Sequence, residues 1–148
     1  MGALKQLTLS QKGVILLSAL TLVLGLTNLG RAVLAVHFAA RPPGLPTTVS
    51  LDYLAATAGL WGVTFIVCSV GLSSFCEWGR WAALAAVTLY ETNAWANRLL
   101  FSGSDYARQM IPRDVALTVS LLCLFWIPLN LPQIRQTFKE DKEPQSAH

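Results

Sequence analysis

The chain has 148 residues, of which 53% are hydrophobic and only 13% are charged. Soluble domains carry about 25% charged residues, so this composition argues against a soluble domain and favours a lipid environment. The net charge of +3 comes from scattered Lys and Arg residues, which gives little support for a nucleic-acid-binding surface. We therefore expect the lipid bilayer as the main partner and no nucleic acid.

The cysteines and histidines form no recognisable chemical motif. Cys68, Cys76 and Cys123 lie in apolar runs without a CxxC pair, and we interpret them as packing residues. The sequence contains no HExxH motif, no histidine cluster and no carboxylate pair at metal-ligand spacing. We therefore identify no catalytic residues, no metal site and no cofactor.

The N-terminal half predicts two membrane spans. Residues 1–12 are a short polar segment, and residues 13–38 form an apolar run long enough to cross a bilayer about 30 Å thick at about 1.5 Å per residue. A cleaved signal peptide is the alternative, but its apolar core usually has about 7 to 15 residues, which favours a retained span. The prolines and glycine of residues 41–46 break the helix, and residues 51–75 form the second predicted span.

The C-terminal half predicts two more spans. The short connection over residues 76–81 implies that the second and third spans are antiparallel neighbours. The third span covers residues 81–101, the fourth covers residues 113–131, and residues 132–148 form a polar tail that we expect to be mobile. The predicted fold is all-α, an integral membrane antiparallel four-helix bundle forming a single domain over residues 13–131.

The distribution of basic residues predicts the orientation of the bundle. Lys and Arg are more numerous in the segments at the end that holds both termini than in the connections at the other end. Because basic loops stay on the cytoplasmic side, we expect a cytoplasmic N-terminal segment, a cytoplasmic C-terminal tail and a location in the plasma or inner membrane.

The third predicted span carries a polar stripe on one side. At about 100° per residue, one helix face carries Tyr90, Asn93 and Asn97, while Glu91 and Arg98 lie beside this face and Trp95 lies just beyond it. The members are Tyr90, Glu91, Asn93, Asn97 and Arg98. A polar face in a span is expected to look into the bundle or into a wet cavity, because polar groups facing lipid are costly.

Depth distinguishes the charged residues of this region. Glu91 lies about 15 Å into the third span, near the midplane, whereas Arg98 lies about 25 Å in, near the far boundary. Arg31 is expected at the same boundary, where Asp52 and Asp114 begin helices and provide candidate acidic partners. We interpret these boundary charges as residues that stabilise the bundle, with ligand binding as the alternative. For Glu91 both a structural and a functional role stay open.

The leading hypothesis is a non-enzymatic bundle with a polar pocket in its non-cytoplasmic half, which binds a small amphiphile, a lipid headgroup or a partner helix. The candidate ligand-binding or ion-binding residues are Asn28, Arg31, Asp52, Tyr90, Glu91, Asn93, Trp95, Asn97 and Arg98.

Three alternatives stay open. The first is an oligomeric small transporter or ion-conducting unit with Glu91 as its titratable site, and the second is an accessory subunit of a larger membrane complex. The third is a membrane enzyme acting on lipid, with Arg31 and Arg98 holding phosphate and Glu91 or His37 moving protons. The sequence has no nucleophile and base at a recognisable spacing, which makes the enzyme the least favoured hypothesis.

Overall fold

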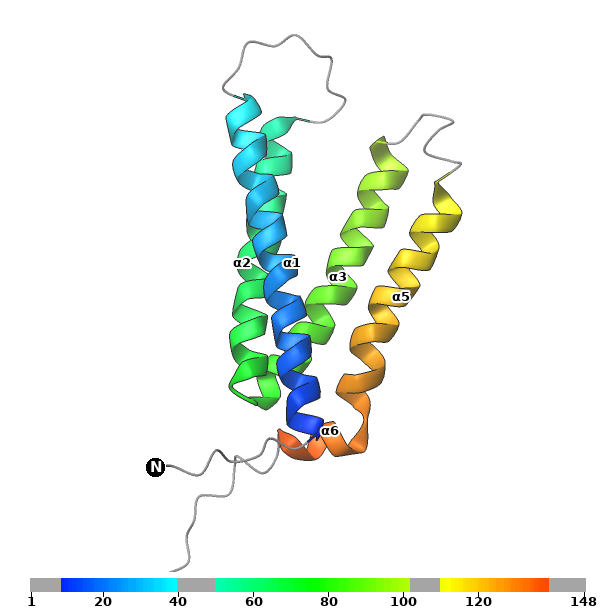
Figure 1. The fold of residues 1–148 in the computed structure, drawn as a ribbon. Coiled ribbons are helices and arrows are strands. Elements are labelled where there is room, and N and C mark those ends of the chain that lie inside the picture. Colours follow the sequence, from blue (N-terminus) through cyan, green and yellow to red (C-terminus); the bar gives the residue numbers. More distant parts are fainter. Residues whose placement is uncertain (1–8, 40–49, 102–109, 139–148) are drawn as a thin grey trace, which may run out of the picture.

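The computed structural model describes residues 9–39, 50–101 and 110–138, and every regular element in these ranges is helical (Figure 1). The helices are α1 (Leu9–Ala39), α2 (Leu51–Ser73), α3 (Glu77–Phe101), α5 (Ile111–Asn130) and the short α6 (Pro132–Thr137). α1 and α2 form one antiparallel hairpin, and α3 and α5 form the other. The predicted all-α helical bundle is confirmed.

Two helices begin earlier than the sequence predicts. α1 begins at Leu9, inside the segment expected to precede the first span, and α3 begins at Glu77 rather than at residue 81. The connection between α2 and α3 is shorter than expected because the chain reverses at Phe75, which has a left-handed φ of 52°. The remaining parts of the two predicted terminal segments, residues 1–8 and 139–148, lie outside the described residues.

Three of the four predicted spans, α1, α2 and α5, are long and apolar enough to cross a membrane. α3 has 25 residues and is therefore also long enough, but it is not among these apolar helices. Its polar side chains, including Glu91, Asn93 and Arg98, lower its hydropathy. The packing of α3 between α2 and α5 explains how a less apolar helix is accommodated in the bundle.

α1 and α2 form the closest helix pair. A Cβ atom on Gly25 would lie 2.9 Å from Cγ1 of Ile66 and 3.0 Å from the carbonyl oxygen of Gly62, so only glycine fits there. Ser18 Oγ also donates a hydrogen bond to the backbone oxygen of Ser69 at 2.9 Å, and Ser69 Oγ donates to the backbone oxygen of Ser18 at 2.9 Å. Small residues and interhelical hydrogen bonds are the usual means of helix association in lipid.

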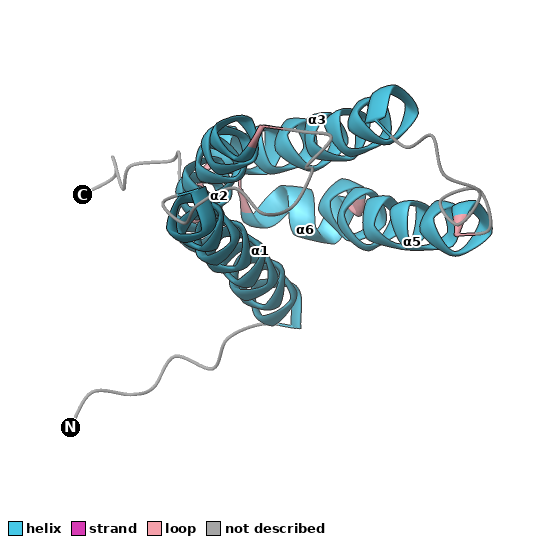
Figure 2. Ribbon diagram, turned by 90° about the horizontal axis from the view of Figure 1, so that it is seen from above, coloured by secondary structure: helices cyan, strands magenta, loops and turns pink. Residues whose placement is uncertain are grey.

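The apolar core lies at the end of the bundle that contains the turn at Phe75 and helix α6, which we call the closed end. The buried hydrophobic residues of this core are Val14, Leu17, Phe65, Cys68, Leu72, Ala83, Leu84, Ala86, Val87, Phe125, Leu129, Ile134 and Phe138. Toward the opposite end, which we call the open end, the α1–α2 and α3–α5 hairpins diverge (Figures 1 and 2).

Helix α6 covers the closed end, in a segment for which the sequence predicts no helix. Pro128 lies inside α5, and the amide of Leu131 donates to the carbonyl of Pro128 at 3.0 Å where the chain turns into α6. Arg80 is only 2% exposed, and its guanidinium donates to the carbonyl of Leu129 at 3.3 Å. Arg80 thus connects the start of α3 to the end of α5.

Candidate functional sites in the open half

The open half of the bundle contains two pockets, which adjoin each other at α3. The first, which we call the amide pocket, has a volume of about 370 Å³ and is lined by Asn28, Arg31, Ala35, Tyr53, Leu54, Thr57, Ala58, Trp61, Tyr90, Asn93, Ala94 and Asn97. The second, which we call the acid pocket, has a volume of about 300 Å³ and is lined by Leu24, Tyr90, Glu91, Ala94, Trp95, Arg98, Asp114, Leu117, Thr118 and Leu121. Tyr90 and Ala94 contribute to both.

The polar stripe of α3 divides between these two pockets. Tyr90, Asn93 and Asn97 line the amide pocket, whereas Glu91, Trp95 and Arg98 line the acid pocket. Both sets have the three- and four-residue spacing of a helix face, and the two faces are adjacent. What the sequence presents as a single stripe therefore serves two separate environments.

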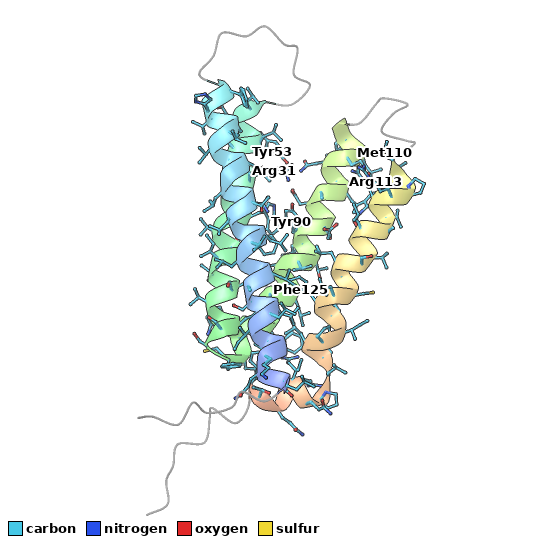
Figure 3. The ribbon with its side chains drawn as sticks, viewed as in Figure 1. Arg31, Tyr53, Tyr90, Met110, Arg113 and Phe125 are labelled. Carbon is cyan, nitrogen blue, oxygen red and sulfur yellow. The ribbon has the colours of Figure 1, made fainter. Side chains whose placement is uncertain are left out.

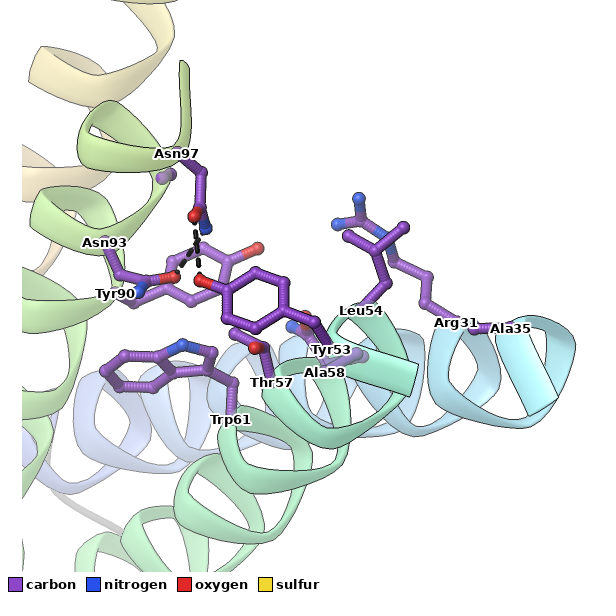
Figure 4. A pocket seen from close by; sticks show the side chains of 12 residues that line it. Arg31, Ala35, Tyr53, Leu54, Thr57, Ala58, Trp61, Tyr90, Asn93 and Asn97 are labelled. Atoms are coloured by element: carbon purple, nitrogen blue, oxygen red, sulfur yellow. Dashed lines mark hydrogen bonds between the residues drawn. The ribbon is translucent and has the colours of Figure 1, made fainter. Parts of the chain in front are cut away.

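The amide pocket is crossed by a hydrogen-bonded chain from α2 to α3. The hydroxyl of Tyr53 donates to Oδ1 of Asn97 at 2.8 Å, and Nδ2 of Asn97 donates to Oδ1 of Asn93 at 3.0 Å (Figure 4). On α1, Asn28 is buried and its amide nitrogen donates to the carbonyl of Leu24 at 2.9 Å. These bonds hold four of the lining side chains in defined orientations.

Aromatic rings separate the amide pocket from the apolar core. The rings of Trp61 and Tyr90 meet edge to face with their centroids 5.5 Å apart. Tyr90 makes a second edge contact with Phe65, which is fully buried, at 5.3 Å. Edge-to-face aromatic contacts contribute free energy in addition to that gained from burying apolar surface. These three rings therefore form a well-packed layer between the pocket and the core.

Among the described residues that line the amide pocket, Arg31 is the only charged one. It lies near the open end at the level of Tyr53, as Figure 3 shows. Within the described ranges, Arg31 forms no hydrogen bond or ion pair, and Asp52, its expected acidic neighbour, lines neither pocket. The guanidinium of Arg31 is therefore available for an external group.

The acid pocket contains a hydrogen-bonded chain that joins α3 to α5. The hydroxyl of Thr118 donates to Oε2 of Glu91 at 2.7 Å, and it accepts a hydrogen bond from Nε1 of Trp95 at 3.0 Å. Thr118 thus fixes the Glu91 carboxylate from the opposite helix. No role is predicted for Thr118 from the sequence, although its position one turn after Asp114 on a mostly apolar helix is a signal that could have revealed it.

An ion pair lies closer to the open end of the same pocket. The guanidinium of Arg98 lies 2.8 Å from Oδ2 of Asp114, which is the acidic neighbour expected for it. Nε and Nη2 of Arg113 both lie 3.2 Å from Oδ1 of Asp114. Arg98 also lies over the ring of Trp95, with 5.3 Å between its Cζ atom and the ring centroid. The Asp114 carboxylate, which is largely buried, therefore has two cationic partners.

The described residues bring no three His, Cys, Asp or Glu side chains together in a group that could hold a metal ion. Three helices of the bundle are long and apolar enough to cross a membrane, which is compatible with a membrane protein, and the two partly polar pockets lie between helices in one half. Comparisons with protein-family models, with curated proteins and with solved structures each find no match.

Proposed function

We propose that this membrane protein binds an anionic amphiphile, with the anionic head in the amide pocket and the apolar part between the diverging hairpins. The observation that carries this proposal is the guanidinium of Arg31, which has no partner within the described part of the chain and lies in a pocket whose described lining contains no acidic residue. A guanidinium is well suited to carboxylate and phosphate groups, because its planar donors match their paired oxygens.

The rest of the pocket suits such a ligand. Its volume of about 370 Å³ lies in the usual range of about 300–1,000 Å³ for small-molecule sites. The amides of Asn93 and Asn97 and the hydroxyl of Tyr53 can orient a polar head by hydrogen bonding, and Leu54 and Ala58 supply apolar surface for the adjoining part of the ligand. An amphiphile matches this combination better than a fully polar solute.

The apolar core at the closed end favours a ligand-binding function over ion conduction. Phe65, Phe125 and Leu129 are fully buried in the core between the two hairpins. A conduction path through a single copy of the bundle would require a polar route through this layer, whereas a binding site requires only one accessible end. We propose that the open end faces the non-cytoplasmic side, because Lys12, Arg80 and Arg135 lie toward the closed end.

Titration of the detergent-purified protein with lysophosphatidylglycerol, followed by native mass spectrometry, tests the proposal. A monoacylglycerol of the same chain length lacks the anionic group, and free glycerol 3-phosphate lacks the chain. We expect the wild type to prefer lysophosphatidylglycerol to both. Arg31→Gln removes charge-assisted hydrogen bonds worth about 1.5–3 kcal/mol, so its affinity should fall by about tenfold or more.

Arg135→Gln is the matched control, because Arg135 is exposed on α6 and lines neither pocket. It should leave lysophosphatidylglycerol binding unchanged. Equal binding of the monoacylglycerol, or an equal loss of affinity in the Arg31→Gln and Arg135→Gln variants, would contradict an anion site at Arg31.

A further inference from the structure

We propose that the acid pocket is a second binding site with the opposite charge preference, and that it takes an organic ammonium ion paired with Glu91. The amide pocket and the acid pocket lie on adjacent faces of α3 and share only Tyr90 and Ala94. The second site is therefore distinct from the anion site proposed at Arg31, and neither depends on the other.

Among the described residues that line the acid pocket, none forms an ion pair with Glu91. Arg98, the only cation among the described lining residues, lies 2.8 Å from Asp114. Among the described residues Glu91 has no ion pair, and its only hydrogen bond comes from Thr118 at 2.7 Å. The pocket that contains Glu91 is also lined by Arg98 and Trp95 from α3, by Asp114 and Thr118 from α5, and by apolar Leu24 from α1.

A half-buried carboxylate without a cationic partner is costly in a membrane-spanning bundle, where such groups usually pair or line a functional path. A cationic ligand would supply the missing charge. The bond from Thr118 leaves Oε1 of Glu91 without a described donor, so this oxygen can face the ligand. The pocket thus presents an oriented carboxylate instead of a freely rotating one.

The lining favours an organic ammonium ion over a metal ion. Hard metal cations take about six or more oxygen ligands, whereas Glu91 and Thr118 supply few. Tyr90 and Trp95 provide aromatic rings, which attract organic cations, and Leu117 and Leu121 provide apolar surface. A volume of about 300 Å³ has room for a compact ammonium ion that carries a small apolar group.

Isothermal titration calorimetry of the detergent-purified protein with phenyltrimethylammonium tests this inference. Its uncharged carbon isostere, tert-butylbenzene, has the same shape and serves as the second ligand. We expect saturable binding of phenyltrimethylammonium only. Glu91→Gln keeps the size of the side chain and should weaken binding by about tenfold or more, as expected for the loss of a partly desolvated charge pair.

Asp52→Asn is the matched variant, because it also removes one acid near the open end but lines neither pocket. It should bind phenyltrimethylammonium like the wild type. The absence of saturable binding to the wild type up to the millimolar range would overturn the proposal. Equal binding of tert-butylbenzene would also overturn it, and this comparison of two ligands on the wild type depends on no variant being folded.

Discussion

Arg98 and Asp114 form an ion pair of 2.8 Å that joins the open half of α3 to the first turn of α5. Asp114 is 8% exposed, whereas the side chain of Arg98 is 35% exposed. The carboxylate of the pair is therefore largely protected from solvent, while solvent reaches the guanidinium. α3 and α5 diverge from the other hairpin toward the open end (Figure 1). The pair therefore stabilises the wall of the acid pocket.

Asp114→Asn should destabilise the protein by about 1–3 kcal/mol, less than the cost of breaking a fully buried pair because solvent reaches Arg98. Chemical denaturation of the detergent-solubilised protein, followed by circular dichroism, measures this change. Asp52→Asn, at an exposed first-turn position of α2, should have little effect. If both variants lost a similar free energy of unfolding, the ion pair would contribute no more than the general interaction of a first-turn carboxylate with its helix dipole.

Gly79→Ala should be strongly destabilising, because a Cβ atom on Gly79 would lie 2.8 Å from Cα of Gly71 on the opposing helix. The backbones of α2 and α3 must separate to relieve this overlap, at a cost of about 2 kcal/mol or more. Gly30→Ala is the control, since a Cβ atom there meets nothing within 4 Å and should be neutral or stabilising by up to about 1 kcal/mol. The same denaturation measurement distinguishes steric overlap from a general effect of replacing helical glycine.

Ser18→Ala and Ser69→Ala should each cost about 0.5–1 kcal/mol, the usual range for hydrogen bonds between membrane helices. The double variant should cost less than the sum of the two, because the hydroxyls lie 3.1 Å apart and belong to one network. Thr27→Ala should change stability less, since the Thr27 hydroxyl bonds only within α1, to Val23. An additive double-mutant cycle would contradict a shared network.

Thr118→Val should destabilise the α3–α5 contact by about 1–3 kcal/mol, because it leaves both the Glu91 carboxylate and the Trp95 indole nitrogen without their partner. Thr118→Ser retains the hydroxyl and should recover most of this loss. Trp95 fluorescence, isolated in a variant whose other tryptophans are replaced by phenylalanine, reports the change in local environment. Equal effects of valine and serine would indicate that the methyl group of Thr118, and not its hydroxyl, matters.

The helical class of the fold, its hairpin order and the polar character of α3 are readable from the sequence. Runs of apolar residues longer than 20 positions, interrupted by proline and glycine, leave few alternatives to helices that cross a membrane. Periodicity also identifies Tyr90, Asn93 and Asn97 as one face, and depth separates Glu91 from Arg98. These properties depend on local composition and on the 3.6-residue repeat, which any single helix carries in its own sequence.

The tertiary structure decided which helix each polar side chain meets. Glu91 accepts a hydrogen bond from Thr118, 27 residues further along the chain, and Arg31 forms no ion pair with Asp52 although both lie near the open end. Periodicity shows which residues share one face of a helix, but it does not show which neighbouring helix that face contacts. The contact depends on how each helix is rotated about its axis and on the angle between the two hairpins. The helix rotations and the angle between the hairpins are set by close backbone contacts, such as that between Gly25 and Gly62, and by the packing of the apolar core at the closed end. The division of one polar stripe into an amide pocket and an acid pocket is therefore a property of the assembled bundle.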